Sequence, residues 1–208
     1  STNTAVGNSA LRGYPYTQGQ ETGNSTGVHN VAVGYQAGLA YNSASYNVFV
    51  GNEAGEYIDD GEYNVALGYQ AGQYATGSQN TFVGSQAGKG GTTSAPYSSG
   101  QYNTAVGYRA LEEFTTGGYN AILGQEAGEK ITSSDSNALL GYRAGRNLTT
   151  GGGNVVIGYE ALRDEPVAEV VIIGARAGLY NSGGYNVIVG NQAGRNSFAG
   201  TDQVIIGH

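Results

Sequence analysis

A nine-residue motif that recurs along the whole chain constrains the fold more than any other feature. The copies begin 17 or 16 residues apart, except for spacings of 27 and 23 after the first and fifth copies. Glycine holds the fifth position in all twelve copies, and alanine holds the eighth in all eleven copies that reach it. This regularity predicts a single repeat array over residues 1–208, in which each unit contacts its neighbours. The copies occupy residues 3–11, 30–38, 47–55, 64–72, 80–88, 103–111, 120–128, 137–145, 154–162, 170–178, 186–194 and, truncated, 203–208.

The residues of each motif favour a strand followed by a sharp turn. Positions two to four are mostly β-branched or otherwise apolar, which is typical of a short buried strand. The glycine at position five suits a corner, and a second glycine, as at Gly61 and Gly117, lies three residues before many of the next copies and marks a return turn. We therefore predict an all-β, repetitive parallel β-solenoid of about twelve coils of ~17 residues, flattened into a roll with two short strands per coil.

The third and fourth motif positions are apolar in every copy, and consecutive side chains of a strand point to opposite faces. We expect the fourth position, always Val, Leu or Ile, to fill the interior of each coil. The third position then needs a cover from outside, and identical chains are the simplest source. The expected coil core is Val33, Val50, Leu67, Val83, Val106, Leu123, Leu140, Ile157, Ile173 and Val189. The expected seam between chains is Phe49, Phe82, Ile122, Leu139, Val156, Ile172 and Ile188.

Two files of polar side chains would result from such stacking. The first motif residue is asparagine in ten of the twelve copies. Stacked about 4.8 Å apart, these amides would hydrogen-bond along the axis. The seventh position alternates in charge over Arg109, Glu126, Arg143, Glu160 and Arg176, so neighbouring coils would place opposite charges side by side. Exposed ion pairs contribute at most about 1 kcal/mol, so we interpret this file as fixing the register.

The composition argues against several classes of function. The 208 residues include 9 basic and 16 acidic side chains, for a formal net charge of −7, and no basic stripe. A nucleic-acid partner is therefore not expected. Membrane insertion is not expected either, because no apolar run approaches the roughly 18 residues that a span requires. The chain contains no cysteine, so neither disulfides nor thiolate ligands are available.

Residues with chemical potential are few and scattered. The two histidines, His29 and His208, occupy repeat positions held elsewhere by Tyr, Asn or Gln, so we interpret them as surface residues. Asp59 and Asp60 lack the spaced carboxylates of a calcium loop and fit a solvated turn. A convex rod also offers no cleft for a glycosidase pair of carboxylates. We therefore predict that the protein is not an enzyme and has no catalytic, cofactor or metal site.

Two insertions, at about 12–26 and 89–99, interrupt the period and are candidates for recognition. Loops on a rigid scaffold often carry binding residues, so Tyr14, Tyr16 and Tyr97 are candidate receptor-binding residues. The alternative is that both insertions are tolerated bulges. Many of the 17 tyrosines lie just after the corner glycine or just before the motif asparagine. Their rings could stack on sugars, or on one another.

The unit Asn-x-x-apolar-Gly-x-x-Ala, with its second glycine, resembles the head repeat of trimeric autotransporter adhesins (YadA-like heads). It is still more similar to the NTAVGYQAG-type arrays of bacteriophage tail fibres. The resemblance covers essentially the whole chain and implies a left-handed β-roll assembled as a homotrimer. The period of 17 is longer than that of the shortest adhesin repeat, so the turn geometry cannot be transferred.

These observations predict a structural and adhesive segment of a viral tail fibre or similar appendage, on a virion or a cell surface. The expected form is a rigid homotrimeric rod about 55 Å long that presents loops to a cell-surface glycan or protein receptor. The alternatives are the head domain of a bacterial trimeric autotransporter adhesin, a fibre-borne glycan depolymerase, and a monomeric solenoid. The first two differ from this interpretation in attachment or chemistry, and the last differs in oligomeric state.

Overall fold

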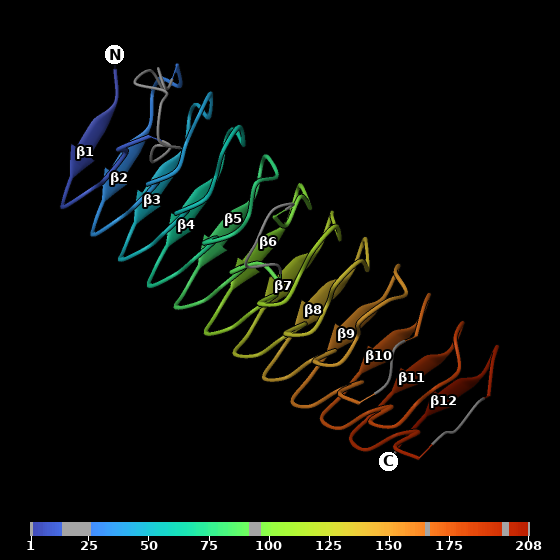
Figure 1. The fold of residues 1–208 in the computed structure, drawn as a ribbon. Helices are drawn as coiled ribbons and strands as arrows, with labels where there is room; N and C mark the ends of the chain where they lie inside the picture. The colour runs from blue at the N-terminus through green and yellow to red at the C-terminus, as the bar shows by residue number, and fades with distance from the viewer. Residues whose placement is uncertain (1, 14–25, 92–96, 165–166, 197–199, 208) are drawn as a thin grey trace.

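The computed structural model describes residues 2–13, 26–91, 97–164, 167–196 and 200–207. The described residues form one elongated stack of coils with the two termini at opposite ends (Figure 1). They contain short strands and turns and no helix. The predicted all-β, parallel β-solenoid is therefore confirmed.

Each motif contributes one three-residue strand to a single twelve-stranded parallel sheet, in which every strand pairs with its neighbours in sequence. The register joins equivalent motif positions: Val31 lies opposite Val48, and Ala32 lies opposite Phe49. Successive coils therefore lie directly on top of one another, as predicted. The strands are β1 (Thr4–Val6), β2 (Val31–Val33), β3 (Val48–Val50), β4 (Val65–Leu67), β5 (Thr81–Val83), β6 (Thr104–Val106), β7 (Ala121–Leu123), β8 (Ala138–Leu140), β9 (Val155–Ile157), β10 (Val171–Ile173), β11 (Val187–Val189) and β12 (Val204–Ile206).

The predicted assignment of the two apolar motif positions to the two faces of the sheet is wrong. The third-position side chains lie inside the coil with 0 to 2% exposure, so they are core rather than seam: Phe49, Phe82, Ile122, Leu139, Val156, Ile172 and Ile188. The fourth-position side chains lie on the outer face, half-buried or exposed, so they are not coil core: Val33, Val50, Leu67, Val83, Val106, Leu123, Leu140, Ile157, Ile173 and Val189.

The reason for the exchange lies in how the narrow coil interior is filled. The wall opposite the strands comes from residues eleven positions after the motif asparagine, such as Ile58, Phe114, Ile131 and Leu148, all 0 to 2% exposed. The buried alanines at position eight complete the interior. Only the middle residue of each strand faces this wall, because side chains alternate along a strand. The flanking second and fourth positions therefore face outward together.

In some coils a small side chain at the third position is compensated by a large one at the ninth. Where the strand supplies Phe82, position nine is Gly88, and a β-carbon there would overlap the Phe82 ring. Where the strand supplies only Ala105, position nine is Leu111, which is fully buried although its φ is +54°. Burial of a leucine side chain contributes about 1.5–3 kcal/mol, which offsets the roughly 1–2 kcal/mol cost of a left-handed backbone. Ala32 and Ala66 are followed instead by Gly38 and Gly72, and the rings of Phe49 and Phe82 from the next coils lie beside these glycines.

The prediction of two strands per coil is wrong, because the return run is not a regular strand. Outside the named strands, only the bridges Tyr41–Asp59 and Ala75–Ser98 are formed within the described residues. The residue before the motif asparagine has a positive φ, as at Tyr46 (62°), and this interrupts the extended conformation that a strand requires.

The predicted asparagine ladder is confirmed. The backbone N–H of Asn47 donates to Oδ1 of Asn30 over 2.9 Å, and Nδ2 of Asn47 donates to the carbonyl oxygen of Gly61 in the return run of its own repeat over 2.9 Å. Equivalent backbone-to-amide bonds continue from Asn64 to Asn154. Because these side chains are buried, each bond replaces hydration that the fold removes. The motif asparagine therefore fastens each coil to both of its neighbours.

Candidate functional surfaces

The most extensive unusual surface is the outer face of the sheet, which consists of the second- and fourth-position side chains of β1–β12. We call it the apolar face. Every one of its residues is Val, Leu, Ile, Ala or Thr, and none is charged. Leu123, at 51% exposure, and Leu140, at 44%, are among its most exposed residues away from the ends. A shallow hollow of about 390 Å³ lies at the middle of this face, lined by Thr104, Val106, Ala121, Leu123, Ala138, Leu140 and Ile157, with two core side chains beneath.

The apolar face has the size of the largest apolar patch expected on a soluble single chain. Twelve strands spaced about 4.8 Å apart, each about 10 Å long, give a strip on the order of 500 Å². The largest apolar patch of a soluble monomer is commonly about 300–600 Å², and such patches often mark interaction sites. The strands that carry this strip follow one another without a break along the stack (Figure 1), so the strip is a candidate for contact with another polypeptide.

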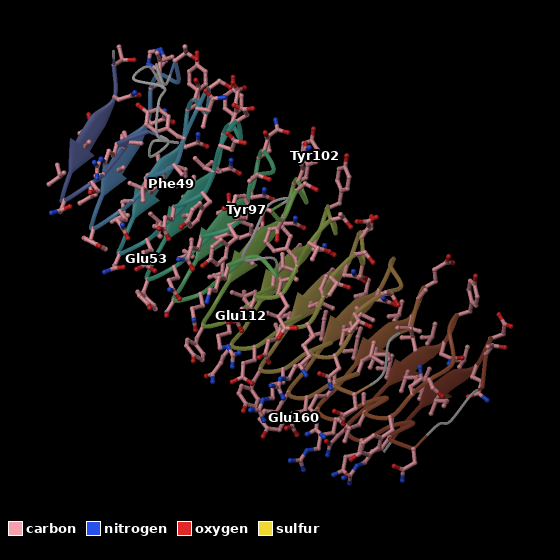
Figure 2. The ribbon with its side chains drawn as sticks, in the orientation of Figure 1. Phe49, Glu53, Tyr97, Tyr102, Glu112 and Glu160 are labelled. Carbon is pink, nitrogen blue, oxygen red and sulfur yellow. The ribbon has the colours of Figure 1, made fainter. Side chains whose placement is uncertain are left out.

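A second surface is the charged edge, which consists of the side chains at motif positions seven and ten. Figure 2 shows Glu53, Glu112 and Glu160 along this edge of the stack. The predicted alternation is confirmed for four members: Arg143 contacts Glu126 at 2.7 Å and Glu160 at 4.0 Å, and Arg176 contacts Glu160 at 3.0 Å. Opposite charges on neighbouring coils are therefore paired across this part of the stack.

Arg109 departs from the predicted pattern. It pairs with Glu112 of its own coil and with Glu129 of the next coil, at 3.0 Å, rather than with Glu126. The tenth position thus carries a second charged file that the sequence analysis did not identify. Its members recur 17 residues apart, and that spacing was the available signal. They are Glu112, Glu129, Arg146 and Arg163.

The two charged files form one network. Arg146 pairs with Glu129 and lies 3.5 Å from Glu126, and Arg163 contacts Glu160 at 3.0 Å. The hydrogen bond from Arg143 lowers the pKa of Glu126. Burial alone would raise the pKa of Glu160, but hydrogen bonds from Arg176 and Arg163 outweigh it and the pKa is lowered. These carboxylates are held ionised by arginines, an arrangement that suits register and stability.

Nearer the N-terminus the same edge carries amides in place of arginines. Nε2 of Gln73 donates to Oε2 of Glu56 over 2.7 Å and to Oε2 of Glu53 over 3.0 Å. Burial raises the pKa of Glu56, because a neutral amide compensates a desolvated carboxylate less than an arginine does. Glu56 is therefore a buried carboxylate whose hydrogen-bond donor is the neutral amide of Gln73 rather than a cationic side chain.

Of the three candidate receptor-binding tyrosines, only Tyr97 lies within the described residues; Tyr14 and Tyr16 lie outside them. On either side of residues 92–96, the N–H of Gly91 donates to the carbonyl oxygen of Phe114 and the N–H of Ser98 donates to the carbonyl oxygen of Tyr74. Tyr97 is half-buried and packs against Tyr57 and Tyr74, with ring centroids 5.1 and 6.0 Å away. Tyr97 thus closes a ring cluster at the base of the insertion. Its role in receptor binding stays a prediction.

The Tyr57 ring of this cluster has an unusual environment. Burial, together with the nearby charge of Glu56, raises the pKa of Tyr57 to about 12. The phenol is therefore neutral throughout the physiological range. It contributes packing and hydrogen bonding rather than charge to this part of the edge.

A third surface is the tyrosine edge, formed by the residues that precede each motif asparagine. The rings stack on one another there and remain exposed, and their stacking on sugars stays a prediction. Ring centroids lie 4.9 Å apart for Tyr46 and Tyr63 and 4.8 Å apart for Tyr102 and Tyr119. His29 continues the file on Tyr46 at 5.0 Å, and its Nδ1 lies 2.9 Å from Oγ1 of Thr2. Tyr102 projects from the edge opposite the charged edge (Figure 2).

Next to Tyr102 and Tyr119 the tyrosine edge contains a hollow of about 330 Å³. Polar groups from three successive coils surround it, and the sequence analysis did not single it out. The backbone N–H of Gly118 donates to Oδ1 of Asp135 over 2.6 Å at its floor. We call this hollow the Tyr119 pocket; its lining is Ser99, Gln101, Tyr102, Thr116, Gly118, Tyr119 and Asp135.

No family model, curated protein or solved structure matches the chain. In the part of the chain that the structure describes, no three His, Asp or Glu side chains are grouped as a metal site. Among the same residues no helix is long and apolar enough to cross a membrane. The apolar face, the charged edge and the tyrosine edge are therefore the features from which function can be argued.

Proposed function

We propose that this chain is a structural and adhesive segment of a fibre, in which three copies associate through the apolar face. The observation that carries the proposal is the uncovered strip of Val, Leu, Ile, Ala and Thr along all twelve strands. Burying such a strip gains roughly 25 cal/mol per Å², so on the order of 10 kcal/mol is available per chain before the costs of association.

An identical chain suits this strip better than an unrelated partner does. The strip repeats about every 4.8 Å, and a second copy repeats at the same spacing, so contacts made at one coil recur at the next. A flat, uncharged sheet face also gives no ionic pattern with which to select a different protein. The number three rests on the resemblance to trimeric fibre heads. In this proposal the second- and fourth-position residues form the seam between chains, and not the third-position residues that the sequence predicted.

The other two surfaces remain available in such an assembly. The charged edge and the tyrosine edge flank the sheet and lie on opposite edges of the stack (Figure 2). The charged network ties coil to coil, and the tyrosine edge and the insertions present side chains outward. We propose a rod that holds recognition groups at fixed spacing on a virion tail fibre or cell surface and binds a glycan or protein receptor. The same rod would serve as the head of a bacterial trimeric autotransporter adhesin.

A mechanical and binding role is also favoured over catalysis. The buried carboxylates of the charged edge are engaged by arginine or glutamine side chains, as in Glu126 with Arg143 and Glu56 with Gln73. Depolymerisation of a glycan requires an acid and a base that converge on a substrate cleft. Incubating the purified protein with candidate polysaccharides and sizing the products tests this part of the proposal, and shortened chains would contradict it.

Sedimentation equilibrium tests the assembly. Three copies of a 21.3-kDa chain give about 64 kDa, whereas an unassociated chain gives 21.3 kDa. Leu140→Glu places a charge at the centre of the apolar face and should shift the mass toward that of one chain. Thr150→Glu places the same charge in the exposed return run of the same coil and should leave the mass near 64 kDa. A wild-type mass of one chain, or equal effects of the two variants, would contradict the proposal.

A further inference from the structure

We propose that the Tyr119 pocket binds one uncharged pyranose ring of a glycan, with Tyr119 as the stacking platform and Asp135 as the principal hydrogen-bond acceptor. The inference rests on the proposed attachment function and gives it a site and a ligand class. The pocket lies in the return run of the coils, away from the apolar face, so it stays open when chains associate.

The file of aromatic rings ends at this pocket and leaves one ring face free. Tyr119 stacks on Tyr102 with an interplanar angle of 12°, and the next residue of the file, one coil further along, is Ser136. Tyr119 is 63% exposed, more than any other tyrosine of the described residues. A planar group stacked on the free face would take the place that another tyrosine would fill.

Polar groups lie at the same level as that free ring face. Asp135 precedes Ser136 in the chain, so its carboxylate belongs to the coil over which the ligand would stack. Oδ1 of Asp135 already accepts the N–H of Gly118, which fixes the carboxylate and leaves Oδ2 to accept hydroxyl protons. The hydroxyls of Ser99 and Thr116 and the amide of Gln101 complete the lining.

A pyranose ring matches this combination of a free aromatic ring face with convergent hydrogen-bond acceptors and donors. Its C–H face packs on an aromatic ring, and its hydroxyls donate to a carboxylate and accept from an amide. The hollow of about 330 Å³ lies at the low end of the range for small-ligand sites, which suits a single sugar residue of a longer chain.

Two other ligand classes fit less well. A quaternary ammonium group is held by rings that enclose it from several sides. Tyr102 and Tyr119 are nearly parallel and stacked on each other, so they cannot enclose a cation. An acidic sugar would bring a second negative charge to Asp135, in a chain whose formal net charge is already −7. The pocket therefore selects for a neutral sugar.

Saturation-transfer NMR and titration calorimetry on the assembled protein test the inference, with methyl glycosides of glucose, galactose, mannose and N-acetylglucosamine as probes and glucuronic acid as the acidic comparison. We expect at least one neutral glycoside to bind and the acidic sugar to bind more weakly. Tyr119→Ala should weaken that binding by about fivefold to tenfold, and Tyr119→Phe should retain it, because the ring face is kept. Asp135→Asn should also weaken binding, since Oδ2 is lost as an acceptor.

Tyr185→Ala is the matched control. Tyr185 occupies the same repeat position, has a similar φ of 58° against 57° for Tyr119, and is 58% exposed, but it lies outside the pocket. Its loss should leave sugar binding unchanged. Absence of binding by every neutral glycoside, or equal effects of Tyr119→Ala and Tyr185→Ala, would overturn the inference. Sedimentation of the same samples separates that result from failure of the trimer, because a 64-kDa species that binds no sugar contradicts the pocket alone.

Discussion

Adding one methyl group at the corner glycine Gly51 should separate two coils of the stack. Gly51 follows β3 with a φ of +140°, a region that side-chain-bearing residues rarely adopt. A β-carbon there would lie 2.6 Å from the carbonyl carbon of Gly68 in the next coil, and closer to its oxygen. The backbone of the neighbouring coil would have to move. That movement would break the bond in which the N–H of Gly68 donates to the carbonyl of Val50 over 2.8 Å.

The expected cost of Gly51→Ala is the sum of these effects. The unfavourable backbone conformation costs about 1–3 kcal/mol, and the lost hydrogen bond costs about 1 kcal/mol. Residual overlap adds to both, so we expect a loss of at least about 3 kcal/mol in the free energy of unfolding. Gly153→Ala is the control. Its φ is +73°, and its β-carbon would lie 3.4 Å from Cγ of Glu169, an ordinary contact, so only about 1 kcal/mol should be lost.

Denaturant unfolding at one fixed chain concentration compares the two variants, because assembly makes apparent stability depend on concentration. Amide hydrogen exchange then locates the change. The Gly68 N–H should lose protection in Gly51→Ala and keep it in Gly153→Ala. Equal losses of stability in the two variants, or full protection of Gly68 in Gly51→Ala, would refute the reasoning that close backbone packing requires glycine at the corner.

Three further predictions concern the interior and the charged edge. Leu111→Gly should cost about 2–5 kcal/mol by leaving a cavity, and adding Ala105→Ile should restore part of that stability in thermal unfolding; an uncompensated loss would contradict the shared-volume argument. Glu56→Gln should stabilise the protein at pH 7, because burial raises the pKa of Glu56. The wild type then gains stability as pH falls through that raised pKa, so the advantage of the variant should shrink in acid; a constant difference would count against this assignment. Glu160→Gln should instead destabilise the protein at pH 7, because hydrogen bonds from Arg176 and Arg163 overcome burial and lower the pKa of Glu160. The loss of stability caused by Glu160→Gln should be complete above the ordinary carboxyl pKa. It should disappear as pH falls through the lowered pKa of Glu160, and urea midpoints measured across this pH range test the prediction.

The repeat made the stacked architecture predictable, because a period repeated over twelve copies leaves few folds in which like positions can meet. The asparagine ladder followed for the same reason: an amide repeated at the start of every strand bonds to its equivalents once the coils stack. The alternation from Glu126 to Arg176 was likewise readable from spacing alone. These features depend only on the period and on the chemistry of a single position.

The assignment of faces depended on a relation between positions that the motif does not show. Fourth-position residues are uniformly Val, Leu or Ile, and such uniformity predicts an interior position. In the structure the varied third position is the interior, because Phe82 is matched by Gly88 and Ala105 by Leu111. The uniform Val, Leu and Ile residues of the fourth position instead form the regular outer face of the sheet. The buried leucines Leu111 and Leu162, which follow the small Ala105 and Val156, were the available signal in the sequence.

The Tyr119 pocket could not be predicted from the motif, since it arises where the pattern changes. It requires the aromatic file to stop at Ser136, a glycine at position 118 and a carboxylate at Asp135, in two adjacent coils. Each of these residues is unremarkable in its own repeat. Only the register that places them side by side makes a site.

Cysteine cross-linking tests the central claim, that the apolar face is where copies of this chain meet. The chain has no cysteine of its own, so Leu140→Cys and Thr150→Cys each introduce a single thiol. Disulfides form only where two Cα atoms come within roughly 7 Å. Under mild oxidation Leu140→Cys should yield covalently linked pairs of chains within a 64-kDa assembly, and Thr150→Cys should stay unlinked. Unlinked Leu140→Cys chains, with a sedimentation mass of 21.3 kDa, would contradict it.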